Sequence, residues 1–125
     1  MSSAGTRPTI LIVDDELSLR DMLTSVLQLE GYSVELATNG QEAIDILQRS
    51  PATRRIVLLD LVMPILDGWG VVRWLVEHPE VKANVKVILM SANERLRQAS
   101  DLEHDAELEK PFGVDNLLLV LGRFS

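Results

Sequence analysis

Three acidic residues directly follow a short apolar run near the start of the chain. In the stretch ILIVDDE, residues 10–16, Asp14, Asp15 and Glu16 come after four apolar residues. Such a run is typical of a strand that is buried on both faces, as in a parallel sheet. Clustered carboxylates repel one another unless a cation offsets their charge, and hard divalent cations prefer oxygen ligands. The stretch therefore indicates either a divalent cation site or the acidic first turn of a helix.

Three further residues with chemically active side chains lie at the ends of other apolar runs. Asp60 ends the run RIVLLD, Ser91 ends VKVILMS, and Lys110 follows AELE. Each has a purely structural explanation, since Asp60 could cap a turn, Ser91 could begin a helix as part of a capping box, and Lys110 could be a solvated strand end. Separate explanations do not account for their common position at strand ends, which favours one shared site.

The surrounding sequence alternates between patterns typical of strands and of helices. Strands are predicted at residues 10–13, 32–38, 55–61, 85–91 and 106–110, and helices at residues 17–30, 41–49, 71–77, 94–102 and 114–123. Gly31 is placed to end the first helix and His78-Pro79 to end the third. Five such repeats predict an α/β fold, in which a parallel sheet is covered by helices on both faces. Ligands of these folds bind beyond the carboxyl ends of the strands, where the acidic residues, Ser91 and Lys110 lie.

These side chains together suit the transfer of a phosphoryl group. Asp14, Asp15 and Asp60 can hold Mg²⁺, with waters completing its octahedral coordination. The cation would reduce the charge of an incoming phosphoryl group, and Asp60 would attack it to form an acyl phosphate. Lys110 would supply a positive charge for the phosphoryl oxygens, while the Ser91 hydroxyl and nearby backbone N–H groups would donate hydrogen bonds.

The chain resembles the receiver domain of two-component response regulators over almost its whole length. The matching pieces are LIVDDE, GYSVELATNGQEAI, IVLLDLVMPILDGW, VILMSA and EKPF. The resemblance implies a flavodoxin-like, doubly wound (βα)5 fold with strand order 2-1-3-4-5. It also implies that Asp60 is the phosphoacceptor, that Asp15, Asp60 and the backbone carbonyl of Val62 ligate Mg²⁺, and that Asp14 acts through water.

The same resemblance assigns the phosphoryl contacts and the phosphoryl donor. Ser91, Lys110 and the backbone of Ala92 are expected to contact the phosphoryl group, and Lys110-Pro111 is expected to be a cis peptide. The expected donor is a histidine kinase or a histidine phosphotransfer protein. The product would switch protein–protein interactions, with a downstream target or effector domain that the sequence does not name.

Three features depart from the pattern of this family. Glu107 stands three residues before Lys110, where the family usually has an aromatic residue whose rotation accompanies phosphorylation. The approach to the fifth strand reads EHD, residues 103–105, in place of the usual GAD. The segment from Ser91 to Lys110 is also shorter than usual, which predicts a truncated fourth helix. We therefore expect a modified switch, or output through another surface.

Composition limits the other classes of function. The 125 residues suffice for a single domain, with an expected core at residues 8–124 and an N-terminal tail at residues 1–7. A formal net charge of -7 argues against direct nucleic acid binding by this domain. The absence of cysteine fits a cytoplasmic protein, and neither a signal peptide nor a membrane-inserted segment is predicted. Such a domain could stand alone or form part of a longer protein.

Several other residues invite functional readings that have structural alternatives. His78 and His104 are expected at the solvated surface rather than in a relay or metal site. Trp74 is expected to pack against the sheet, and Trp69 to lie in the core or at the rim of the site. In the last helix the inward stripe is predicted to be Val114, Leu117, Leu118 and Leu121, with Val120 and Phe124 on the flank. Leu119 then points outward, so this helix is a candidate surface for a dimer or another protein contact.

Two other functions fit parts of the pattern. A phosphatase resembling the haloacid dehalogenases would also use an aspartyl nucleophile, but it needs a second acid two residues further on. Leu17 follows Asp15 at that spacing and Val62 follows Asp60, so neither aspartate fits. A receiver-shaped interaction module that works without phosphate is disfavoured by the complete set of acidic, serine and lysine residues, although Glu107 mildly favours it.

Apolar Val62 predicts slow to moderate self-hydrolysis of the acyl phosphate, because its side chain cannot orient a water through a hydrogen bond.

Overall fold

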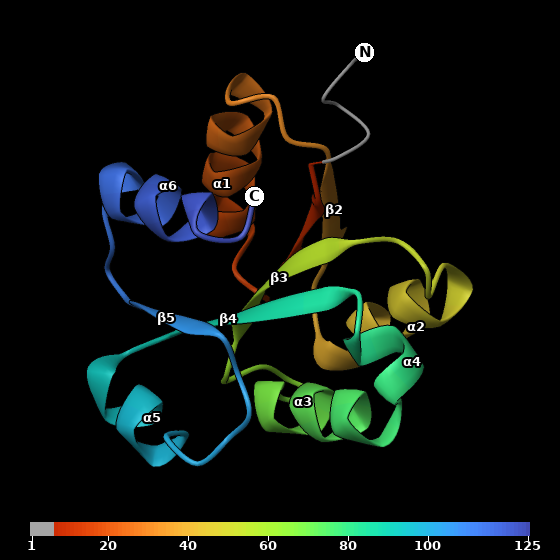
Figure 1. Cartoon of the computed structure of the whole chain (residues 1–125). Helices are drawn as coiled ribbons and strands as arrows, with labels where there is room; N and C mark the ends of the chain where they lie inside the picture. The colour runs from red at the N-terminus through yellow and green to blue at the C-terminus, as the bar shows by residue number, and fades with distance from the viewer. Residues whose placement is uncertain (1–6) are drawn as a thin grey trace.

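The fold is a five-stranded parallel sheet with helices on both faces (Figure 1). The computed structural model describes residues 7–125, and the strands lie in the order β2-β1-β3-β4-β5. The strands are β1 (Thr9–Val13), β2 (Val34–Ala37), β3 (Arg55–Asp60), β4 (Val85–Ser91) and β5 (Ala106–Glu109). The helices are α1 (Leu17–Leu29), α2 (Gly40–Arg49), α3 (Gly68–Glu77), α4 (Pro79–Lys82), α5 (Asn93–Gln98) and α6 (Val114–Gly122). This confirms the predicted α/β class and strand order.

Alternate residues of the central strands enter two separate cores. Ile10 and Ile12 of β1 pack with Leu23 of α1 and Leu117 of α6 on one face. Leu11 and Val13 belong to the core on the other face, where α2, α3, α4 and α5 contribute buried side chains. Because successive side chains of a strand point to opposite faces, a strand covered on both sides must be apolar throughout. That requirement explains the unbroken apolar runs of β1, β3 and β4.

The register of the sheet aligns the carboxyl ends of the strands. Val13 lies beside Ala37 of β2 and beside Leu59 of β3, while Asp60 lies beside Met90 and Ser91 beside Glu109. The residues that follow these positions therefore emerge at one edge of the sheet. This edge carries the predicted site.

Two helices differ from the predicted ones because of local capping. The third helix begins at Gly68 rather than residue 71, since the Asp67 side chain accepts a hydrogen bond from the backbone N–H of Gly70 at 2.9 Å. That helix ends before His78-Pro79 as predicted, but the chain then forms α4, an extra short helix with Pro79 at its first turn. Gly31 follows α1 with a φ of 89°, the left-handed conformation expected of a helix-ending glycine.

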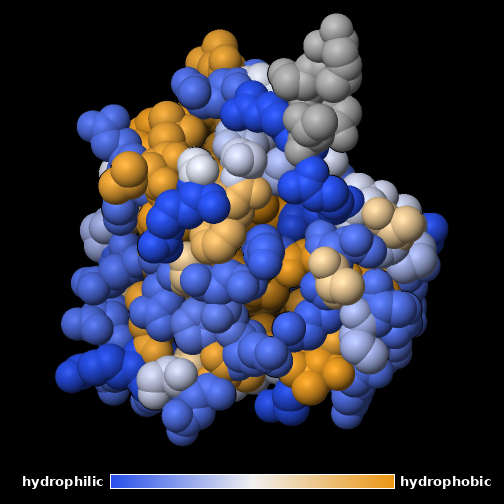
Figure 2. Space-filling model, in the orientation of Figure 1, coloured by the Kyte–Doolittle hydropathy of each residue, from blue (hydrophilic) through white to orange (hydrophobic). Residues whose placement is uncertain are grey.

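Other predicted elements are longer than the observed ones. The second strand covers only Val34–Ala37, and the helix predicted at residues 94–102 ends at Gln98. In the last helix the predicted inward stripe is partly wrong, because Val114 is 41% exposed whereas Val120 is buried. Leu119 is 72% exposed, as expected, and Figure 2 shows hydrophobic atoms at the surface over α1 and α6. A dimer through α6 stays a prediction.

Both histidines are less solvated than predicted. His78 is half-buried, stacks on the Trp74 ring with centroids 4.0 Å apart, and its Nδ1 lies 2.7 Å from the Trp74 carbonyl oxygen. His104 is also half-buried, with its Nε2 2.7 Å from Glu107 Oε2. Packing against neighbouring side chains, which single-residue burial tendencies do not capture, accounts for the difference. Trp74 and Trp69 both pack against the core, as expected.

The predicted tail overlaps the described residues by a single position. Arg7 donates a hydrogen bond to the Glu30 carbonyl oxygen at 2.6 Å, and its guanidinium lies 3.8 Å from the centre of the Tyr32 ring. The rest of the predicted tail, residues 1–6, lies outside the described residues. Within residues 7–125, no helix is both long and apolar enough to cross a membrane.

A partly buried ion pair stabilises the edge of the sheet opposite the site. The Arg55 side chain is 1% exposed; it donates to Glu35 at 2.7 Å and to the Ser50 hydroxyl at 2.6 Å. We expect Glu35→Ala to lower the free energy of unfolding by about 1.5–2 kcal/mol, because a buried charge loses one of its partners. Urea unfolding measures this change. The exposed pair Lys82–Glu103 is the matched control, and Glu103→Ala should change stability by less than about 0.5 kcal/mol. Equal effects of the two variants would contradict the prediction.

Candidate functional site

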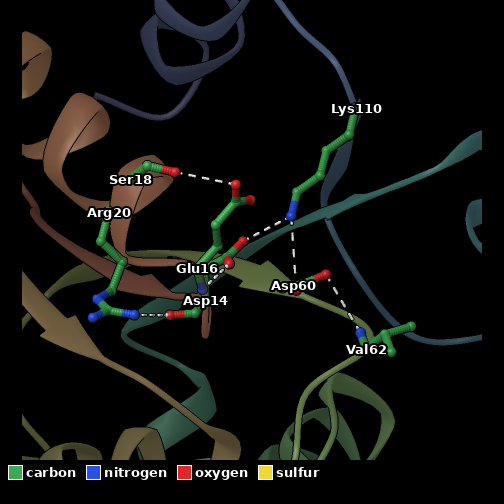
Figure 3. Close-up of polar contacts among 7 residues, drawn as sticks. All are labelled: Asp14, Glu16, Ser18, Arg20, Asp60, Val62 and Lys110. Atoms are coloured by element: carbon green, nitrogen blue, oxygen red, sulfur yellow. Dashed lines mark hydrogen bonds and ion pairs between the residues drawn. The ribbon is translucent and has the colours of Figure 1, made fainter.

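Asp14 lies buried at the end of β1 and is held by neighbours on three sides. Its side chain is about 1% exposed and accepts a hydrogen bond from the Glu16 backbone N–H at 2.8 Å. Lys110 Nζ donates to its second carboxylate oxygen at 2.8 Å, and Arg20 Nη1 donates to its main-chain carbonyl at 2.9 Å. Figure 3 shows these contacts converging on the strand end. The first two of these hydrogen bonds stabilise a carboxylate in a buried position, and the third holds the backbone next to it.

Asp60 closes β3 and faces the same space (Figure 3). One carboxylate oxygen lies 3.7 Å from Lys110 Nζ, and the other accepts a weak hydrogen bond of 3.4 Å from the Val62 backbone N–H. Burial raises the pKa of Asp60 from 3.8 to about 6; Lys110 opposes this rise, whereas Asp14 and Asp15 add to it. Asp60 is therefore a carboxylate with high proton affinity, and a nearby cation would stabilise its ionised form.

Lys110 directly follows β5, and its ammonium contacts both Asp14 and Asp60. Burial alone would lower the pKa of its ammonium, but the hydrogen bond that it donates to Asp14 and the charges of Asp60, Asp14 and Glu16 raise this pKa instead. The ammonium is therefore charged at neutral pH. The predicted cis peptide between Lys110 and Pro111 is confirmed.

The three aspartates form a group that fits a hard divalent cation. One oxygen from each of Asp14, Asp15 and Asp60 can be chosen so that all lie within 4.8 Å of one another. Asp15 is exposed whereas Asp14 and Asp60 are buried, so the group opens to solvent on one side. Carboxylate oxygens that leave room for water suit Mg²⁺, which keeps several waters in its octahedral shell. Val62, the predicted carbonyl ligand, lies beside Asp60, and its side chain is half-exposed.

Ser91 is part of β4 and does not act as a helix cap. It is 4% exposed, pairs with Glu109 of β5, and its carbonyl accepts a hydrogen bond from the Lys110 backbone N–H at 2.8 Å. Ala92 occupies the N-cap position of α5, so the proposed capping-box role of Ser91 is wrong. Ser91 and Ala92 therefore lie at the same sheet edge as Asp60 and Lys110, which is the placement the resemblance implied.

Two contributors to this edge were missed by reasoning from the sequence. Arg20 reaches back from α1 to the Asp14 carbonyl, although nothing in the sequence distinguishes it from a surface arginine. Gly68 packs so closely that an added Cβ would lie 2.6 Å from the Asp60 carbonyl oxygen and 2.9 Å from Leu61 Cα. The Asp-Gly pair at residues 67–68 could have suggested a turn, but not this close approach.

A cavity of about 420 Å³ opens next to the acidic group. Its lining is largely apolar and comes from α1 and the segment after β5: Glu16, Leu19, Met22, Lys110, Pro111 and Phe112. The cavity connects the surface of α1 with Lys110. A protein that binds there would lie close to Asp60.

Glu107 lies on β5, at the position where the resemblance predicts an aromatic residue. Its side chain is 42% exposed and pairs with His104 through the 2.7 Å contact. Glu107 also lines a cavity of about 370 Å³ between α5, β5 and α6, together with Arg97 and Glu109. A carboxylate side chain that pairs with a histidine therefore lines this cavity.

Comparison with known proteins relates the chain to response regulators of signal transduction. A sequence profile described as "Response regulator receiver domain" matches residues 10–121. The transcriptional regulatory protein CpxR homolog of Haemophilus influenzae is 38% identical over 112 residues, which are 87% of this chain and 46% of that protein. The chain thus spans less than half the length of this relative.

Solved structures agree with the sequence match. The chemotaxis response regulator CheY4 of Vibrio cholerae superposes with a TM-score of 0.83 at 27% identity, over 95% of this chain and 99% of that one. The receiver domain of the sensor histidine kinase PA1611 from Pseudomonas aeruginosa, solved with magnesium in its active-site cleft, superposes with a TM-score of 0.79. Its identity is 25%, over 94% of this chain and 96% of that one. Because the family profile covers nearly the whole sheet and its acidic edge, this chain belongs to the family of response regulator receiver domains.

Proposed function

We propose that this chain receives a phosphoryl group from a phosphohistidine on Asp60 and thereby switches its contacts with other proteins. The observation that carries the proposal is the convergence of Asp14, Asp15 and Asp60 within 4.8 Å, with Lys110 Nζ 3.7 Å from Asp60. Metal-ligating carboxylates beside a fixed ammonium are the groups that phosphoryl transfer to a carboxylate requires. A bound Mg²⁺ would neutralise phosphoryl oxygens and align them with Asp60.

The residues of this chain then have distinct tasks. An Asp60 carboxylate oxygen attacks phosphorus, a P–O bond forms, and the P–N bond breaks with its electron pair returning to the donor imidazole. Lys110 lies where its ammonium can follow a phosphoryl oxygen, since it already contacts both aspartates. Ser91 and the Ala92 backbone would donate to another oxygen. Asp14 and Asp15 would hold the metal, with Val62 contributing its carbonyl.

The donor is proposed to be a histidine kinase or a histidine phosphotransfer protein that docks over the cavity beside Lys110. Its apolar lining on α1 and after β5 offers a contact surface close to Asp60. Exposed apolar side chains of α1, among them Leu17 at 62% and Met22 at 39%, extend that surface. Docking there would bring a donor histidine to the open side of the acidic group.

The readout is proposed to differ from the usual rotation of an aromatic ring. Glu107 is tied to His104, and α5 has only six residues, so the segment that usually rearranges is both charged and short. NMR chemical shifts of the free and beryllofluoride-bound protein test this proposal. The ordinary rearrangement of α5 and β5 would contradict it.

Intact-mass measurement after incubation with acetyl phosphate tests the function itself. We expect a gain of one phosphoryl group that requires Mg²⁺ and disappears in Asp60→Asn, because no carboxylate nucleophile remains. Asp101→Asn, at an exposed loop position, is the matched control and should be phosphorylated like wild type. Absence of any gain in wild type would favour a module that binds partners without phosphate.

Turnover of a free phosphate ester separates the phosphatase alternative. A phosphatase would release many equivalents of phosphate per chain, whereas a receiver transfers one group to itself and loses it slowly. The residues two positions beyond Asp15 and Asp60 are Leu17 and Val62, which supply no acid for such turnover. We therefore expect no multiple turnover.

The lifetime of the acyl phosphate is expected to depend on Val62. Its side chain is 51% exposed beside Asp60 and cannot orient an attacking water through a hydrogen bond. Val62→Asn should therefore speed the loss of the phosphoryl group several-fold, and Val62→Leu should leave it near wild type. Loss of phosphate is followed by intact mass after the donor is removed. Slower loss from the asparagine variant than from wild type would show that the argument is wrong.

A further inference from the structure

Arg20 contacts the acidic edge in a way that differs from Lys110. Lys110 occupies a carboxylate oxygen of Asp14, whereas Arg20 Nη1 donates to the Asp14 main-chain carbonyl at 2.9 Å (Figure 3). Arg20 is half-buried and comes from the first turns of α1. It therefore brings a guanidinium to this edge while leaving the carboxylate oxygens of the acidic group available for a cation.

Three hydrogen bonds at or next to Asp14 hold the turn that carries Asp14 and Asp15. The Asp14 backbone N–H donates to the Ala37 carbonyl at 3.1 Å, and the Glu16 backbone N–H donates to the Asp14 carboxylate at 2.8 Å. The Arg20 side chain donates to the Asp14 carbonyl, which lies between these two N–H groups in the chain. A short turn with these three contacts has little freedom, so the directions of the Asp14 and Asp15 side chains are defined before a cation arrives.

The positive charge of Arg20 and its hydrogen bond to the Asp14 carbonyl have opposite effects on cation binding. Hydrogen bonds from the backbone N–H and hydroxyl of Thr38 lower the pKa of Glu42, and the positive charge of Arg20 lowers it further. The charge of Arg20 therefore acts on other groups at this edge of the sheet. A fixed positive charge near a cation site repels the cation. Removing Arg20 would therefore strengthen cation binding through charge but weaken it through loss of position, and the two effects differ in sign.

We infer that Arg20 is a positioning residue for the divalent cation site, one that fixes the 14–16 turn through the Asp14 carbonyl. This inference rests on the proposed function, since it assumes that the acidic group binds a cation. It predicts that the geometric effect outweighs the electrostatic one. Residues that orient metal ligands commonly change metal affinity by about 10–100-fold when removed.

The test is binding of Mn²⁺, a spectroscopic substitute for Mg²⁺, to the full chain without any phosphoryl donor. The electron paramagnetic resonance signal of free Mn²⁺ measures its affinity for wild type, Arg20→Met, Arg20→Lys and Arg73→Met. Arg73, an exposed arginine on α3, is the matched control for removal of one positive charge. We expect about tenfold weaker binding in Arg20→Met, near wild-type binding in Arg20→Lys, and little change in Arg73→Met.

Each other outcome overturns the inference in a distinguishable way. Equal or tighter binding by Arg20→Met would show that Arg20 acts only through charge, and the proposed function would stand. Absence of Mn²⁺ binding in wild type would overturn both this inference and the metal-dependent function. Urea unfolding without metal shows whether Arg20→Met folds. An unfolded variant would assign Arg20 a structural role in place of the positioning role.

Hydrogen exchange at the Glu16 amide gives a second readout, and faster exchange in folded Arg20→Met supports the inference.

Discussion

Replacing Asp60 with Asn is expected to raise the free energy of unfolding of the metal-free protein by up to about 3 kcal/mol at about pH 7.5. Asp60 has a pKa of about 6 in the folded chain against an ordinary value of 3.8, mainly because it is buried. Between these two values the folded state binds more protons than the unfolded state, so stability falls as the pH rises through this window. Above about pH 6 Asp60 is ionised in both states, and the full loss of stability caused by burying its charge is present. An amide of the same shape carries no charge and avoids it.

Urea unfolding in the presence of a chelator, at several pH values, measures this effect. Wild type should gain stability as the pH falls from about 7 towards about 4, and Asp60→Asn should lack this part of the pH dependence. Asp101→Asn, at an exposed position, should behave like wild type. Parallel pH profiles for wild type and Asp60→Asn would show that Asp60 does not titrate abnormally. Mg²⁺ should stabilise wild type more than Asp60→Asn, since it binds the ionised group.

Gly68→Ala is expected to lower the free energy of unfolding by about 3 kcal/mol and to slow phosphorylation of Asp60. An added Cβ would lie 2.6 Å from the Asp60 carbonyl oxygen, and backbone atoms cannot move aside as a flexible side chain can. Gly68 also holds the loop that follows β3, because its backbone N–H donates to the Leu61 carbonyl at 3.0 Å. Displacing this loop moves both the Asp60 backbone and the Val62 carbonyl that is proposed as a metal ligand.

The matched control is a glycine with open space around it. Among residues 7–125, nothing lies within 4 Å of a Cβ built on Gly122, the last residue of α6. Gly122→Ala should therefore leave stability unchanged or raise it by about 0.5 kcal/mol, through reduced freedom of the unfolded chain. Thermal or urea unfolding compares the two variants. A Gly68→Ala protein as stable as Gly122→Ala would mean that the loop relaxes without cost.

The sequence by itself determined the fold class and most of the candidate site. Strands buried on both faces must be apolar throughout, so β1, β3 and β4 could be recognised without a structure. Because parallel strands end at a common edge, the residues after them could be assigned to one site, and the structure brings Asp14, Asp15, Asp60 and Lys110 together there. Local signals that stand next to each other in the chain carried this information.

Contacts between distant segments were decided only by the tertiary structure. Val120 is buried and Val114 exposed because the rotation of α6 depends on its packing against the sheet and α1, which the spacing of apolar residues alone does not fix. His104 can pair with Glu107 only because the loop before β5 places the two side chains next to each other. The Arg20 contact with the Asp14 carbonyl and the close approach of Gly68 to Asp60 involve backbone atoms, which every residue carries. Their partners depend on three-dimensional distance rather than on residue type, and for that physical reason the sequence did not reveal them.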